Sequence, residues 1–223
     1  MAIRQFFWKI KDYLQSTDKT PLNVIASKDG QIYEVRDHFV GRFVTRVKHV
    51  KELDEVKEGF QFYLPKIPSS LLEMTLSFFK HFCTDDEQNE VMVVIYWDRR
   101  LEEYVITCPQ QEVSKAHIEA EFDEQFLFSE RYVPVLHIHS HNSIRAYFSL
   151  TDNENEGRGM MCLYGVVGQL DQDTPELKFR AGSRGDYISF PIDLIFENPT
   201  LNTNGYFPYE WLERVYVAGG EGL

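Results

Sequence analysis

Three histidines and one aspartate lie in a segment that could bind a metal ion. His137, His139 and His141 alternate with other residues, and Asp152 follows His141 by eleven positions. Side chains two residues apart on a β-strand point to the same face, so His139 and His141 can present both imidazole rings to one ion. An aspartate at the start of a following helix can return to the strand end. Two imidazoles and one carboxylate leave a fourth position open, which is typical of catalytic zinc sites.

A glutamate stands at the beginning of a strongly apolar segment upstream. Glu90 precedes the sequence Val-Met-Val-Val-Ile-Tyr-Trp, whose β-branched and aromatic residues predict a strand buried on both faces. The structural interpretation of Glu90 is a solvated charge that ends the acidic loop 85–89.

A serine completes the spacing of a known motif. The chain carries His-Ser-His at 139–141, then seven residues, Ser149, two residues and Asp152. This pattern resembles the JAMM motif of the JAB/MPN (Mov34/MPN/PAD-1) zinc metalloproteases. Starting the count at His137 would put a tyrosine at the serine position, so His137 lies outside the matching set. The family also has a glutamate at the head of a buried strand that follows an amphipathic helix, and Glu90 matches it in position.

The resemblance implies a zinc-dependent hydrolase that cleaves a peptide or isopeptide bond. His139, His141 and Asp152 would bind Zn²⁺. Glu90 would accept a proton from the attacking water and pass it to the leaving amine, and Ser149 would stabilise the oxyanion or orient the water. The partners implied are protein or peptide-conjugate substrates, including ubiquitin-like ones.

Two residues depart from the usual pattern of the family. Asn142 stands where a proline is usual after the second metal-binding histidine, and Val93 stands where a glycine is usual after the glutamate. The first change alters the turn that leaves the strand. The second narrows the groove in which a peptide tail would lie.

Several of these residues also have structural interpretations. Ser149 and Asp152 fit a helix capping box, in which a serine and an acidic residue three positions later satisfy free amides of the first helical turn. His137 is interpreted as a packed or hydrogen-bonded neighbour of the site. The remaining histidines have no partner at ligand spacing and are interpreted as structural: His38, His49, His81 and His117.

Two other functions compete with hydrolysis. One is a catalytically inactive, metal-free MPN-like scaffold or protein-binding module, against which the complete set of motif residues speaks. The other is a different His-x-His metallohydrolase. An amidohydrolase barrel would have its His-x-His near the first strand, and a metallo-β-lactamase would have an aspartate where His141 stands.

The elements that position these residues predict an α+β fold, sandwich-like, with a mixed central sheet and flanking helices. The resemblance implies a JAB/MPN core of the cytidine-deaminase-like kind. Apolar residues at helical spacing predict a helix from Ser69 to about Cys83, and another helix is expected near Thr151. Residues 110–131 are acidic and polar, and we expect a partly helical loop near the rim of the site. Strands are predicted at 90–97, 104–107, 133–139, 163–167, 177–181 and 187–191.

Three regions are expected along the chain. Residues 1–62 would form a small β-rich extension, with a short helix at 3–14, strands at 22–26, 31–35, 39–47 and 60–64, and a hairpin turn at Asp29-Gly30. Residues 63–199 would form the JAB/MPN metalloprotease domain. Residues 200–223 would be a tail with a short helix at 209–214.

Composition excludes several classes of protein. With 223 residues, of which 43% are hydrophobic, the chain can bury one sizeable core. A net charge of -12 argues against affinity gained by neutralising phosphates, so we expect no nucleic-acid partner. The apolar runs are far shorter than the ~20 residues of a membrane span, and the start of the chain does not resemble a signal peptide. We therefore expect no membrane association.

The cysteines indicate a compartment. Cys83, Cys108 and Cys162 are odd in number and widely spaced, so they fit neither a disulfide framework nor a CxxC metal site. We expect a cytoplasmic protein.

Overall fold

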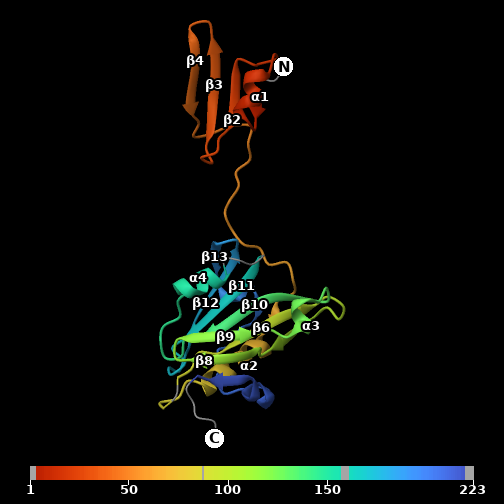
Figure 1. Cartoon of the computed structure of the whole chain (residues 1–223), viewed down its shortest axis with the longest axis vertical. Coiled ribbons are helices and arrows are strands. Elements are labelled where there is room, and N and C mark those ends of the chain that lie inside the picture. Colours follow the sequence, from red (N-terminus) through yellow and green to blue (C-terminus); the bar gives the residue numbers. More distant parts are fainter. Residues whose placement is uncertain (1–3, 87, 157–160, 219–223) are drawn as a thin grey trace. The chain divides into compact units, whose positions relative to one another are not determined.

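The computed structural model describes residues 4–86, 88–156 and 161–218 (Figure 1). The chain divides between Glu58 and Gly59 into two compact units, here the N-terminal and the C-terminal unit. Strands account for 39% of the chain and helices for 18%. The expected mixed sheet is present, but there is less helix than the expected α+β class implies. The protein is mostly β, with several sheets and few short helices. Within the described residues, no helix is long and apolar enough to cross a membrane.

The N-terminal unit is a four-stranded sheet with one short helix. Its strands lie in the order β1-β2-β3-β4, and β1 is parallel to β2. Tyr13, Ile25 and Val35 form its small core. The elements are β1 (Arg4–Phe7), α1 (Ile10–Gln15), β2 (Leu22–Ala26), β3 (Ile32–His38) and β4 (Gly41–Arg46).

Two sequence predictions for this unit have different outcomes. The turn at Asp29-Gly30 is confirmed, because Gly30 has a φ of 73° and its amide donates to the carbonyl of Ser27. The helix predicted at 3–14 is wrong in its first half, where β1 lies. Pairing with β2 gives this segment backbone partners that its three- and four-residue apolar spacing did not reveal.

The C-terminal unit is built on a six-stranded mixed sheet. Its order is β13-β12-β11-β10-β6-β7, in which β10 and β11 are parallel and all other neighbours are antiparallel. The strands predicted here are confirmed, with ends shifted by one or two residues. They are β6 (Met92–Asp98), β7 (Glu103–Thr107), β10 (Tyr132–Ser140), β11 (Cys162–Gly168), β12 (Glu176–Ser183) and β13 (Asp186–Phe190).

Strand alternation sends the core and the site to opposite faces of this sheet. On β10, Leu136 and Ile138 pack in the same buried cluster as residues of α2 (Ser69–His81), the helix predicted from Ser69. The residues between and after them, His137 and His139, therefore point to the other face. The face of the sheet toward α2 is closed to solvent. Side chains of α2 are fully buried there, among them Leu72, Leu76, Phe78 and Phe79. The opposite face is left for the site.

A second, smaller sheet borders that open face. Its order is β15-β8-β9, formed by β8 (Gln110–Ser114), β9 (His117–Glu121) and β15 (Val215–Val217). The loop expected over 110–131 is therefore wrong, apart from the one-turn helix α3 (Glu124–Leu127). The sequence did not indicate β8 because one of its two buried positions is polar. This residue, Gln111, bonds to the backbone of Met92.

The last elements that the structure describes contact the same core. The predicted helix at 209–214 is present as a 3-10 helix, η2 (Tyr209–Arg214), and its Trp211 lies in the main buried cluster. Residues 60–64 are not a strand, although Phe60 and Phe62 pack against that cluster. The remaining elements are β5 (Ile67–Pro68), paired with β14 (Phe196–Glu197), and η1 (Ile192–Leu194).

Candidate metal centre

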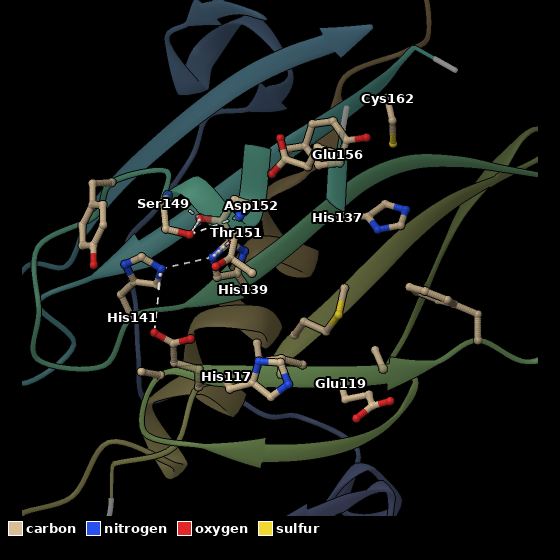
Figure 2. Close-up of a pocket in the computed structure, with 18 of the residues that line it drawn as sticks. His117, Glu119, His137, His139, His141, Ser149, Thr151, Asp152, Glu156 and Cys162 are labelled. Atoms are coloured by element: carbon tan, nitrogen blue, oxygen red, sulfur yellow. Dashed lines mark hydrogen bonds and ion pairs between the residues drawn. The ribbon is translucent and has the colours of Figure 1, made fainter. Parts of the chain in front are cut away.

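The end of β10 brings the two motif histidines together. Backbone bonds from Ser140 to Val91 and from His141 to Val167 fix the strand end between its neighbours. The Nε2 atoms of His139 and His141 lie 3.2 Å apart (Figure 2). The rings thus converge as predicted, even though β10 ends at Ser140 and His141 follows it.

Helix α4 (Leu150–Glu156) supplies the third donor. Oδ1 of Asp152 lies 3.5 Å from Nε2 of His139, and one donor atom from each of the three residues falls within 4.8 Å of the others. The helix predicted near Thr151 is therefore confirmed. Among the described residues this is the group that could hold a metal ion.

The other oxygen of Asp152 belongs to a capping box. The amide of Ser149 donates to Oδ2 of Asp152 at 2.6 Å, and the amide of Asp152 donates to Oγ of Ser149 at 3.1 Å. The Ser149 hydroxyl also donates to Oδ2 at 2.7 Å. The capping interpretation is thus confirmed. It leaves Oδ1 directed toward His139.

The loop between β10 and α4 explains the residue after His141. Asn142 has a φ of 49°, a left-handed conformation that asparagine tolerates and that the fixed φ of proline, about -65°, excludes. Its carbonyl accepts a bond from the amide of Leu170. The loop passes so close to β11 that a Cβ on Gly168 would lie 2.2 Å from the carbonyl oxygen of Ile144. The backbone at this position therefore does not admit the proline of the JAB/MPN motif that the sequence resembles.

Glu90 lies beside His141. Its Oε1 is 3.8 Å from Nε2 of His141, and its amide donates to the carbonyl of Ser114. Burial, and then the negative charge of Asp152, raise the pKa of Glu90 to about 8. The interpretation as a solvated charge is wrong, because the side chain is only 12% exposed.

The charges of the three donors suit a metal cation. Burial lowers the pKa of His139 and that of His141, so both rings are neutral at pH 7. Burial alone would raise the pKa of Asp152, but His139 and the bonds from Ser149 hold that pKa below its usual range. Two neutral imidazoles and one carboxylate are the protonation states that metal binding requires. The nitrogen and oxygen donor set fits Zn²⁺.

The candidate ligands line a pocket of about 900 Å³. Residues 116–120 form one of its walls. His137 lies in this pocket, apart from the ligand group (Figure 2). Its ring centre is 5.6 Å from that of Phe122 and 5.9 Å from that of Tyr164. Its interpretation as a packed neighbour is confirmed.

Several pocket residues carried no signal in the sequence. His117, interpreted as structural, is exposed on β9 and lines the pocket together with Glu119. Tyr147 lines it as well, with its ring 4.7 Å from that of His141. The alternation of residues 117–121 was the available signal for the strand, but a mixture of charged and small residues masked it.

No family model matches the chain, and no curated protein matches it. The geometry of the site itself therefore carries the functional conclusion.

Proposed function

We propose that the chain is a zinc-dependent hydrolase of the JAB/MPN type that cleaves a peptide or isopeptide bond, and that its C-terminal unit has the JAB/MPN core. The observation that carries this is the convergence of His139, His141 and Asp152. A single proton on Nε2 of His139 can bridge to His141 or to Asp152, but not to both. One cation would satisfy all three donors at once.

The residues around this group suit hydrolysis. A bound zinc ion would polarise the scissile carbonyl group and activate the attacking water. Glu90, buried beside His141, would take the proton of that water and deliver it to the leaving amine. Burial and the charge of Asp152 raise the pKa of Glu90 to about 8 without an ion, and a bound cation would lower it toward neutral pH, where the group can both accept and release a proton. Ser149 would hold Asp152 in place through its hydrogen bonds. Its substitution by alanine would distinguish this role from the oxyanion role that the resemblance implies.

The wall of the pocket supports an extended peptide as substrate. Side chains alternate between the two faces of a strand, so a run of consecutive lining residues, 116–120, indicates that the pocket follows the edge of β9. Within the described residues β9 pairs only with β8, which leaves this edge free. A peptide segment could add to it as another strand, as expected for the tail of a protein or ubiquitin-like conjugate.

Charge and cysteine chemistry support the remaining expectations. From residue 59 onward the chain has 12 Lys or Arg and 26 Asp or Glu residues, a balance unsuited to nucleic acid. Cys83, Cys108 and Cys162 are all free thiols, which fits the proposed cytoplasmic location.

Substitution of the proposed acid-base residue tests the function. Glu90→Gln keeps the size of the side chain but cannot accept a proton, so we expect bound zinc to remain and turnover to fall by about 10²–10⁴-fold. Turnover would be measured on a panel of peptide and ubiquitin-like conjugates. Glu119→Gln, which changes another glutamate of the same pocket, is the control and should stay within a few fold of wild type. Equal turnover of Glu90→Gln and wild type would remove Glu90 from the mechanism.

A further inference from the structure

Helix α4 has little to hold it in place by itself. It has seven residues, and its one apolar residue, Leu150, is 82% exposed. A helix this short is marginal in water without packing. Its last turn also carries Glu154 and Glu156, and acidic groups at a helix C-terminus are unfavourable. Yet this helix must hold Asp152 to within a fraction of an ångström of a metal-binding position.

The side chain of Arg180 on β12 supplies the missing attachment. Its Nε donates to Oε2 of Glu156 at 2.8 Å, and its Nη1 donates to Oδ1 of Asn153 at 2.7 Å. Asn153 and Glu156 are three positions apart and lie on one side of the helix. The arginine and the glutamate side chains are only 7% and 9% exposed. One guanidinium group thus bonds two residues of the helix, Asn153 and Glu156, to the sheet.

Two aromatic rings hold the guanidinium itself. Its carbon lies 3.7 Å from the ring centre of Phe148 and 3.9 Å from that of Tyr187. Phe148 directly precedes the cap residue Ser149, so the arginine also contacts the segment that enters the helix. The hydroxyl of Tyr187 donates to the carbonyl of Asn153 at 3.0 Å. The planar group is therefore fixed on both faces and along its edge, an arrangement that lysine reproduces only in part.

We infer that Arg180 is a positioning residue of the metal centre, which clamps α4 so that Asp152 stays opposite His139. This inference rests on the proposed function, because it assigns Arg180 to the affinity of the proposed zinc site. Asp152 lies between the two anchors, the capping box at Ser149 and the arginine contacts at Asn153 and Glu156. The cap orients the carboxylate within the first turn, and Arg180 orients the helix against the sheet.

Metal affinity and helix protection measure this role. We expect Arg180→Met to weaken zinc binding by about 10- to 100-fold, the usual effect of removing a partner that orients a ligand. The zinc Kd would be obtained by competition with a chromophoric chelator. The visible spectrum of the Co²⁺-substituted protein would report the ligand geometry, and hydrogen exchange of α4 amides in the metal-free protein would report the helix. Arg180→Lys should restore part of the affinity.

A matched control separates positioning from general stability. Arg131→Met removes another arginine that pairs with a buried carboxylate of the same sheet, Asp98, away from α4. We expect it to lower the melting temperature but to leave the zinc Kd and the cobalt spectrum unchanged. Asn153→Ala and Glu156→Ala remove the acceptors on the helix and spare the sheet. If Arg180→Met does not fold, the zinc Kd and the α4 amide exchange of these two variants test the clamp.

The outcomes are distinct. Weaker zinc binding and faster exchange in the Arg180 or acceptor variants, with the Arg131 variant unchanged, would support the clamp. Wild-type zinc affinity in folded variants, or an equal loss in Arg131→Met, would overturn it while leaving the proposed function intact. Failure of the wild type to bind zinc would instead overturn the proposed function and the inferred link to the metal with it, and the exchange data would then report the helix alone.

Discussion

Asp152 uses its two carboxylate oxygens for different purposes. Oδ2 accepts the bonds of the capping box, and Oδ1 faces His139. From the sequence, the capping box stood as the structural alternative to a catalytic role of Ser149. In the structure the cap leaves Oδ1 of Asp152 free for a metal ion, because capping and metal binding use different oxygens. A carboxylate held in this way is oriented before a metal ion binds. Orienting the ligands is the general role of their hydrogen-bond partners in metal sites.

Ser149→Ala tests how the serine acts. Its hydroxyl is already bonded to Asp152, so we expect the variant to lose about 1 kcal/mol of unfolding free energy and to bind zinc more weakly. At saturating zinc, kcat should be close to wild type. Ser143→Ala is the control, because that hydroxyl lies in the same loop but bonds to Gln88. A stable, zinc-replete Ser149→Ala protein with kcat reduced by about 10²-fold would instead support direct oxyanion stabilisation.

Asn142 gives a second test at the level of single residues. Its φ of 49° is closed to proline, which the JAB/MPN motif usually has at the corresponding position, and is open to glycine. We expect Asn142→Pro to cost more than about 1 kcal/mol of unfolding free energy and Asn142→Gly to cost less. Chemical denaturation of both variants makes the comparison. Equal stability of the proline variant would mean that the loop adopts another conformation in solution.

Among the elements, the strands that carry the site were predictable and the wall opposite them was not. The segments at 90–97 and 133–139 are rich in β-branched and apolar residues because these strands lie at the centre of the sheet and contribute residues to the main buried cluster. The edge strand β9 lacks that signal, since its exposed residues include His117, Glu119 and Glu121. Pairing with β8, rather than local composition, makes it a strand.

The burial of Arg180 likewise could not be predicted from local sequence. It alternates with the buried residues Phe179 and Ala181 on β12, so the pattern indicates a solvent-facing charge. It is only 6% exposed, because α4 and the rings of Phe148 and Tyr187 cover it. These groups come from separate parts of the chain. Their meeting depends on tertiary structure, which strand alternation does not encode.

The ion pair between Asp98 on β6 and Arg131, the residue before β10, predicts a pH dependence of stability. A hydrogen bond from Arg131 outweighs burial and lowers the pKa of Asp98 to about 2. This lies below the unfolded value of about 4, so the pair stabilises the fold above pH ~4 and loses that contribution as the pH falls toward 2. The unfolding free energy of wild type in urea should therefore drop more steeply over this range than that of Asp98→Asn. Parallel curves would contradict this assignment.

At the scale of the whole molecule, the candidate site belongs to one unit. The candidate ligands, Glu90 and the pocket all lie in the C-terminal unit, which has its own buried cluster. The N-terminal unit has a separate small core and a nearly balanced charge, with 11 Lys or Arg and 9 Asp or Glu residues up to Glu58. The net charge of -12 thus comes from the unit that carries the site. The two units divide a few residues before the boundary expected at 62.

The metal content of the purified full-length chain is the most direct test of the proposed hydrolase. We predict one zinc ion per chain after dialysis against metal-free buffer, and its loss in the double variant His139→Ala, His141→Ala. His117→Ala, which removes a pocket histidine outside the ligand group, should keep the ion. Elemental analysis of the three proteins decides the matter. A wild-type protein that binds no zinc when it is supplied, or a double variant with undiminished zinc, would contradict the assignment.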